Sequence, residues 1–173
     1  MKDYWLAKLI ASVGEVDSRK RLQKSIFLLQ LSGCPLKCDY LLHYYGPYSF
    51  ELAALVDQLN GAQIIEEKPE QLGQGVVRYR SIITEPGKKS LTRFENTKKG
   101  RQLLVQIEPF VGSFGDLNKE NAWVLELAAT TAFYHQVNWN EAKAQTAHFK
   151  KLSLGDGNLK KAIDLAMRFK KSA

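Results

Sequence analysis

The segment from residue 41 to residue 59, LLHYYGPYSFELAALVDQL, constrains the fold more than any other part of the chain. It opens with an aromatic and apolar run that predicts a short strand or extended arm. Gly46 and Pro47 end this run, because glycine adopts unusual backbone angles and proline has no amide hydrogen. Ser49 is a suitable helix N-cap, and apolar residues then recur at helical spacing. Gly61 suits the left-handed position past the end of this helix, which we expect to cover residues 49–60.

Length and composition limit the classes of protein that the chain can form. At 173 residues and 45% apolar composition, it favours one domain, or one small domain with a helical appendage. No run of about eighteen apolar residues is present, so we expect no membrane span. The first residues, with an acid at Asp3, do not resemble a signal peptide, and two cysteines are too few for a disulfide framework. We therefore expect a cytoplasmic protein.

Two helices are expected before the central segment. The first covers residues 4–13 and ends at Gly14, and the second runs to Leu31 from a cap at Asp17 or Ser18. The second helix opens with a basic turn, and cations there oppose the helix dipole unless an anion compensates. Either a phosphate contact or a solvated helix face would explain the cations at this position. The cations are Arg19, Lys20, Arg21 and Lys24.

A β-hairpin is expected after the central helix. Residues 62–67 and 76–83 predict its strands, and the polar residues 69–75 form a turn too long for a tight hairpin. Arg78 and Arg80 alternate along the second strand, so both side chains point to one face. That face either contacts DNA or is solvated.

The sequence between this hairpin and the next helix predicts irregular structure. Residues 86–89 read as a loop, and residues 91–94 as a short extended piece. The loop contains Lys88 and Lys89, which can hold phosphates. Thr97 then begins a helix with an apolar side.

Three motifs carry resemblances to known families. RLQKSIFLLQ at residues 21–30, followed by YYGPYS at residues 44–49, is similar to bacterial proteins of the YwgA type. It is more loosely similar to the Panacea antitoxin domain, whose members share an LQK motif on an apolar helix followed by YGP. FENTKKG at residues 94–100 resembles the entry to the helix after the wing in many bacterial winged-helix regulators. The resemblance covers roughly residues 3–110.

The resemblance implies an α+β, mainly α fold: a winged helix-turn-helix domain with a β-hairpin wing, followed by an α-helical C-terminal extension. The interval between the second helix and the capped helix departs from the regulator pattern. It is longer than the turn of a helix-turn-helix motif and contains the aromatic arm. Insertion of residues 49–59 into a DNA groove is therefore in question.

The last third of the chain predicts helices only. Gly112–Gly115 is the expected hinge, and it divides the chain into domains 1–112 and 113–173. The helix at residues 122–132 is apolar on more than one face, and such a helix is normally buried within one chain or between two. We therefore expect a homodimer through residues 116–170. The candidate caps of the three helices are Asp116 or Asn118, Asn138 or Asn140, and Asp156 or Asn158.

Catalytic and metal-binding patterns are weak. His43, His135 and His148 accompany no recognisable nucleophile motif, and the chain has no glycine-rich phosphate loop. Cys34 and Cys38 with His43 offer three zinc ligands, where a structural site needs four. We therefore expect no enzymatic activity, no cofactor and no metal.

An aromatic cluster surrounds the corner at Gly46. Its members either stack on nucleic-acid bases or pack the first helix against the hairpin, and packing is the commoner use of such a cluster. The cluster consists of Tyr40, Tyr44, Tyr45, Tyr48 and Phe50.

The positive charge is unevenly distributed. The net charge of +7 suits nucleic acid or an acidic partner without establishing either. Residues 1–60 carry seven basic and six acidic side chains, a net +1. Residues 61–110 and 111–173 each carry nine basic and six acidic side chains, a net +3. The excess therefore does not lie on the helix at residues 49–60.

These patterns favour a non-enzymatic winged-helix protein that binds double-stranded DNA or regulates transcription. The alternative is a protein-interaction module, such as an antitoxin-like or defence-associated partner protein, because the outward residues of helix 49–60 are poor in cations. DNA binding should weaken steeply with salt, whereas an apolar protein interface should not. The candidate DNA-binding residues are Arg19, Arg21, Lys24, Tyr48, Ser49, Arg78, Arg80, Lys88 and Lys89.

Overall fold

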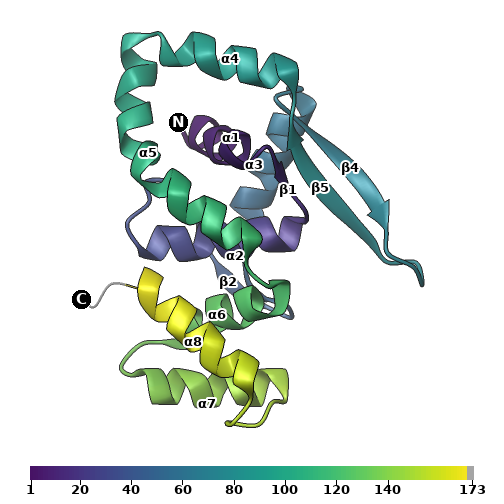
Figure 1. Cartoon of the computed structure of the whole chain (residues 1–173), viewed down its shortest axis with the longest axis vertical. Helices are drawn as coiled ribbons and strands as arrows, with labels where there is room; N and C mark the ends of the chain where they lie inside the picture. The colour runs from purple at the N-terminus through teal and green to yellow at the C-terminus, as the bar shows by residue number, and fades with distance from the viewer. Residues whose placement is uncertain (171–173) are drawn as a thin grey trace.

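The computed structural model describes residues 1–170, which form eight helices and five strands (Figure 1). This confirms the α+β, mainly α class. Within the described residues, no helix is long and apolar enough to cross a membrane. In chain order the elements are α1 (Lys2–Val13), β1 (Glu15–Val16), α2 (Arg19–Leu31), β2 (Leu41–His43), β3 (Gly46–Tyr48), α3 (Phe50–Gly61), β4 (Ile65–Gln71), β5 (Val77–Ile83), α4 (Glu85–Glu95), α5 (Lys98–Lys119), α6 (Ala122–Tyr134), α7 (Trp139–Lys150) and α8 (Gly157–Phe169).

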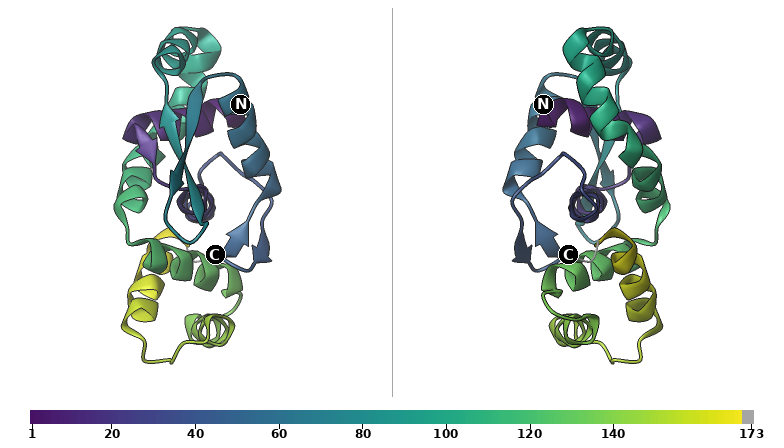
Figure 2. Two further views of the ribbon diagram at one scale, coloured as in Figure 1. Left: turned by 90° about the vertical axis from the view of Figure 1, so that its right-hand side faces the viewer. Right: turned by 90° about the vertical axis from the view of Figure 1, so that its left-hand side faces the viewer.

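Helix α2 lies at the centre of the molecule. Ser18 is its N-cap and accepts a hydrogen bond from the amide of Arg21 at 3.2 Å. The consecutive residues from Arg21 to Leu29 are all buried, because α5, α6, α8, β1, β3 and β5 pack around the helix. Figure 2 shows α2 end-on, with the other elements arranged around it. Since buried polar groups need partners, Gln23 and Lys24 must be satisfied inside the protein.

A three-stranded antiparallel sheet with the order β1-β5-β4 flanks α2. Strands β4 and β5 pair from Ile65 opposite Ile83 to Gln71 opposite Val77, and this hairpin projects from the helical body (Figure 1). Pro69, expected in a turn, lies inside β4. A proline is tolerated there because β4 is an edge strand, and one side of its backbone needs no ladder partner.

The corner and helix α3 form as the sequence predicts. Ser49 is the N-cap of α3, and its hydroxyl accepts a hydrogen bond from the amide of Leu52 at 3.1 Å. The extended arm is the first strand of a two-stranded sheet, in which β2 pairs with β3. The end of α3 differs from the prediction. The helix continues through Gly61, and Gln63 takes the positive φ of 58° as its amide bonds back to Asn60 at 3.0 Å.

Helix α4 replaces the loop and the extended piece expected at residues 86–89 and 91–94. Thr84 is its N-cap and accepts a hydrogen bond from the amide of Gly87 at 2.9 Å. Pro86 fits the first turn, because an amide hydrogen at that position would have no partner in the helix. Capping chemistry therefore outweighs the Pro-Gly pair that suggested a loop.

Helix α5 begins after Thr97, as predicted, and runs through the expected hinge at Gly112–Gly115. The hinge prediction is wrong because one face of the helix buries Ile107, Phe114 and Leu117. This burial outweighs the low helix propensity of the two glycines. The boundary between the two expected domains therefore falls inside a continuous helix.

Helices α6, α7 and α8 pack against one another beneath α2 (Figure 1). Asn138 and Asp156 cap α7 and α8, as predicted. The cap of α6 is Asn121, so Asp116 and Asn118 are wrong as caps. Both lie inside α5, which extends farther than the glycines suggested.

Helix α6 is covered by its own chain. Eight of its residues, between Val124 and Ala132, are buried, and α2, α7, α8 and β3 pack against them. The homodimer through residues 116–170 is predicted because α6 is apolar on more than one face. The packing within the chain already covers that apolar surface, so α6 does not require a second copy. The homodimer itself stays a prediction.

Candidate functional site around the start of helix α2

The LQK and YGPYS motifs bind each other. Gln23 of the LQK motif donates through Nε2 to the carbonyl oxygen of Ser49 at 2.9 Å, and its Oε1 accepts from the Ser49 amide at 2.8 Å. Both residues are buried. Because unpaired buried backbone groups are costly, this double contact stabilises the residue that caps α3.

Lys24 and Gly46 complete the contact between the motifs. Lys24 is 3% exposed and donates to the carbonyl oxygen of Pro47 at 2.7 Å. Gly46 has a φ of 90°, and a Cβ there would lie 2.6 Å from Oγ1 of Thr130. Glycine is therefore required both by the backbone angle and by the close approach of α6.

A second, partly buried cation lies beside this contact. Lys150 of α7 pairs with Glu126 of α6 at 2.5 Å and donates to the carbonyl oxygen of Tyr44 at 3.1 Å. Lysines from α2 and α7 thus both hold backbone carbonyls of the segment between β2 and α3. Burial lowers the pKa of Lys24 to about 8, although the nearby Glu126 carboxylate opposes this shift.

We predict that Lys24→Met flattens the rise of stability with pH between about pH 8 and 10. The ordinary pKa of lysine is about 10.4, so between the two values the unfolded chain binds the additional proton. The free energy of unfolding therefore rises with pH through this group, by about 1 kcal/mol from pH 7.5 to 9. Urea denaturation of both proteins at these two values measures the difference. Other titrating groups cancel in the comparison, and equal slopes would show that the Lys24 ammonium is not buried in solution.

Gln30, two turns along α2 from Gln23, repeats the double contact. It accepts from the Cys38 amide at 2.7 Å and donates to the Cys38 carbonyl oxygen at 3.0 Å. Cys34 and Cys38 are buried free thiols, and burial raises the pKa of each to about 11. Such thiols are poorly ionised near neutral pH and hence weak nucleophiles. In the described part of the chain, no group of three or more His, Cys, Asp or Glu residues can hold a metal ion.

The arginines at the start of α2 bind groups of their own chain. Arg19 donates to Glu67 at 2.8 Å and to Asp57 at 2.6 Å. Arg21 is buried, donates to Asp17 at 2.9 Å, and also contacts two backbone carbonyls near the end of α5. The basic first turn, for which phosphate or solvent was expected, is therefore compensated by carboxylates and carbonyls.

The arginines of β5 are also paired. Arg78 donates to Glu70 at 2.5 Å and lies 4.0 Å from Asp17. Arg80 donates to Glu15 at 2.7 Å. The Arg78 hydrogen bond lowers the pKa of the Glu70 carboxyl. Each guanidinium thus has a carboxylate partner on the sheet or beside it.

The other candidates do not join this cluster. Ser49 is buried as the cap of α3. The ring of Tyr48 packs edge-on against Phe50, with 5.1 Å between centroids. Lys88 and Lys89 are exposed on α4, at the opposite end of the molecule from α6 (Figure 1). The structure therefore brings together the four arginines but separates them from the two lysines of α4.

The aromatic cluster is mostly exposed, so the expectation that it packs the first helix against the hairpin is wrong. Tyr40 packs on Phe27, with 5.0 Å between ring centroids. Tyr44 is 75% exposed, Tyr45 45% and Phe50 66%. These three residues lie at the β2–β3 turn and the start of α3, outside the core formed around α2.

Exposed apolar side chains from the β2–β3 turn, the β4–β5 hairpin and α6 surround the first turn of α2. The ring of Tyr79 lies 5.6 Å from the Arg19 guanidinium carbon, and the ring of Tyr45 lies 3.3 Å from Nζ of Lys20. Cavities of about 290 and 250 Å³ share residues at the starts of α2 and α6. In Figure 2 (left), the β4–β5 hairpin crosses in front of this end of α2. The surface, called here the α2 face, consists of Tyr44, Tyr45, Leu72, Val76, Val77, Tyr79 and Trp123.

The chain is similar to YwgA of Bacillus subtilis, an uncharacterized protein. The two chains are 28% identical over 145 residues, which are 84% of this chain and 81% of YwgA. This similarity supports the YwgA-type resemblance drawn from the LQK and YGPYS motifs. No protein-family model matches the chain.

Two residues of this site were not predicted from the sequence. The LQK motif contains Gln23 and could have marked it as a candidate. The motif does not indicate that Ser49 is its hydrogen-bond partner. Lys150 contacts Tyr44 across 106 positions of sequence, and no local pattern points to such a contact. Both contacts depend on tertiary packing around α2.

Proposed function

We propose that the chain is a winged-helix protein that acts as a protein-interaction module, and that its α2 face binds the partner. The order of helices and strands from α1 to β5, and the sheet order β1-β5-β4, support the winged-helix assignment. In this assignment α3 is the helix that would face DNA, and the β4–β5 hairpin is the wing.

Charge matching around α2 carries this proposal. Four arginines there, Arg19, Arg21, Arg78 and Arg80, bind five carboxylates, Glu15, Asp17, Asp57, Glu67 and Glu70. A DNA-binding surface gains most of its affinity from cations that are free to contact phosphate. Helix α3 contains no lysine or arginine and exposes Glu51 and Asp57. The surface therefore lacks the positive charge that a duplex requires.

The apolar character of the α2 face also suits a protein partner. Tyrosine and tryptophan are enriched in protein interfaces, because they bury large areas with little loss of side-chain entropy. Tyr44 and Tyr79 expose 75% and 45% of their surface. The neighbouring ion pairs can form a polar rim around this apolar centre. An antitoxin-like partner role is the form of this function that the Panacea resemblance implies.

A basic corner between α4 and α5 favours a second candidate function, binding of a nucleic-acid backbone. Six of its side chains are exposed cations, of which only Lys88 has a carboxylate partner within the described residues, Glu85 at 2.6 Å, while the nearby Glu95 pairs with Lys8 at 2.7 Å. A cationic patch of this kind binds phosphates without reading sequence. The cations are Lys88, Lys89, Arg93, Lys98, Lys99 and Arg101.

Two charge-matched double variants separate these functions. We expect Arg78→Ala with Arg80→Ala to leave affinity for duplex DNA unchanged within about twofold, because both arginines are already paired. Lys98→Ala with Arg101→Ala should weaken any DNA binding about tenfold and reduce its salt dependence, because both cations are exposed. Fluorescence anisotropy of a labelled duplex across a salt series measures both. A large loss of DNA affinity in the Arg78/Arg80 variant, with no loss in the Lys98/Arg101 variant, would contradict the proposal. It would indicate that the β4–β5 hairpin contacts DNA.

A further inference from the structure

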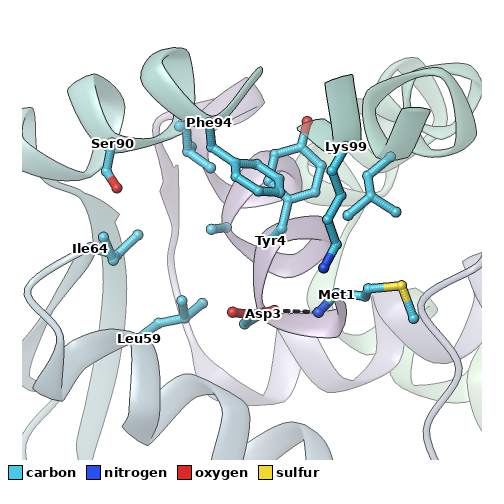
Figure 3. Close-up of a pocket in the computed structure, with 11 residues that line it drawn as sticks. Met1, Asp3, Tyr4, Leu59, Ile64, Ser90, Phe94 and Lys99 are labelled. Carbon is cyan, nitrogen blue, oxygen red and sulfur yellow. Dashed lines mark hydrogen bonds and ion pairs between the residues drawn. The ribbon is translucent and has the colours of Figure 1, made fainter. Parts of the chain in front are cut away.

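A cavity of about 310 Å³ lies between α1, α3, α4 and α5, away from the α2 face (Figure 3). Its apolar lining comes from all four helices and from the residue before β4. A volume of about 300 Å³ is at the small end of the range for ligand pockets, which are mostly apolar with a few placed polar groups. The lining includes the apolar side chains of Met1, Tyr4, Leu59, Ile64, Leu91 and Phe94.

One wall of the cavity is aromatic and fixed in position. The rings of Tyr4 and Phe94 lie 5.0 Å apart between centroids, tilted by 55°. The Tyr4 hydroxyl donates to Glu95 at 3.0 Å, and Glu95 in turn pairs with Lys8 at 2.7 Å. These bonds satisfy the polar end of Tyr4 outside the cavity. The wall is therefore preorganised to pack against a flat apolar group.

The rim carries polar groups at opposite ends. Lys99 extends from the start of α5 over one end of the cavity, and Ser90 of α4 lies across from it (Figure 3). Asp3 already binds the amine of Met1 at 2.8 Å. Among the ion pairs of residues 1–170, none includes Lys99. An ammonium without a carboxylate partner beside an apolar cavity suits a ligand that carries a negative charge at one end.

We propose that this cavity binds a small organic acid with a flat apolar body. The carboxylate pairs with Lys99, and the body packs on the Tyr4–Phe94 wall and extends towards Ser90. A long apolar side chain of a protein partner would match the lining equally well, but it would not need the charge at Lys99. The dependence of binding on Lys99 therefore distinguishes the two occupants.

Titration of the full chain with 4-phenylbutyrate and with its uncharged analogue 4-phenylbutanol, followed by ¹H–¹⁵N NMR, tests this proposal. We expect millimolar or tighter binding of 4-phenylbutyrate, with shifts concentrated on residues that line the cavity. Lys99→Gln should weaken 4-phenylbutyrate binding about fivefold, the value of one exposed charge pair, and leave 4-phenylbutanol unaffected. Lys98→Gln is the matched control, since Lys98 is also exposed at the start of α5 but does not line the cavity.

A second variant tests the cavity itself. Ser90→Trp places a bulky ring on the rim from an exposed helical position, so binding of both compounds should be lost while the remaining spectrum is preserved. Three results would overturn the proposal: no shifts at millimolar 4-phenylbutyrate, equal weakening by Lys98→Gln and Lys99→Gln, or binding of the acid that is insensitive to Lys99. Binding of 4-phenylbutanol alone would instead assign the cavity to an uncharged apolar occupant and would likewise overturn it.

Discussion

Gly46→Ala should lower the free energy of unfolding by about 3 to 4 kcal/mol, a large part of the stability of a domain of this size. Two effects add. Alanine at a φ of 90° is strained, and its Cβ would lie 2.6 Å from Oγ1 of Thr130. That oxygen cannot move freely, because it donates to the carbonyl oxygen of Glu126 at 2.8 Å. Chemical denaturation measures the loss.

Gly14→Ala is the matched control for Gly46→Ala. Gly14 has a similar φ of 78°, but a Cβ there would meet no atom within 4 Å. It should therefore cost only the backbone strain, about 1 to 2 kcal/mol. Adding Thr130→Ala to Gly46→Ala should recover at least about 1 kcal/mol, because the steric conflict is removed. Equal losses for the two glycines, without recovery, would contradict the close packing of β3 against α6.

Gln23→Ala should cost about 2 to 3 kcal/mol, because the buried Ser49 amide loses its partner and the Ser49 carbonyl oxygen keeps only its bond from the Ala53 amide at 3.2 Å. The loss falls where β3 ends and α3 begins, so amide hydrogen exchange in α3 should accelerate more than exchange in α8. Denaturant titration gives the total loss, and exchange gives its location.

Gln30→Ala is the control for Gln23→Ala, since Gln30 makes the same pair of hydrogen bonds to Cys38. Gln30 is only partly buried, so water can replace its contacts, and we expect a loss of about 1 kcal/mol. A Gln23→Ala protein as stable as wild type would show that the contact between the two motifs does not stabilise the fold.

Capping chemistry and apolar periodicity predicted much of the fold. Ser49, Thr97, Asn138 and Asp156 begin helices as expected, because a side-chain oxygen before an apolar repeat is a local signal. Predictions from glycine and proline were weaker. The Pro-Gly pair after Thr84 suggested a loop, yet it lies in the first turn of α4, where packing and the cap decide the conformation.

The site was harder to predict than the fold, because charge pairing depends on tertiary structure. The sequence presents Arg78 and Arg80 on one strand face, as a DNA-binding wing would. It does not show that β1 and the start of α2 place Glu15 and Asp17 against them. Lys24 was predicted on a basic helical face, but α2 is buried from Arg21 to Leu29, and the Lys24 ammonium binds a carbonyl oxygen. In each case the sequence does not show which elements pack around α2, and these elements supply the partners of the cations.

Site-specific photocross-linking in the native cell tests the proposed function most directly. A photoreactive phenylalanine analogue is placed at Tyr44 and at Tyr79 of the α2 face, and at Val105 of α5 as the control, which is 70% exposed but lies outside that face. We predict that both positions on the α2 face form adducts with the same protein, that these adducts resist nuclease, and that Val105 forms none. Nuclease-sensitive adducts at Tyr44 and Tyr79, or equal protein adducts at Val105, would contradict the assignment of the α2 face as a protein-binding surface.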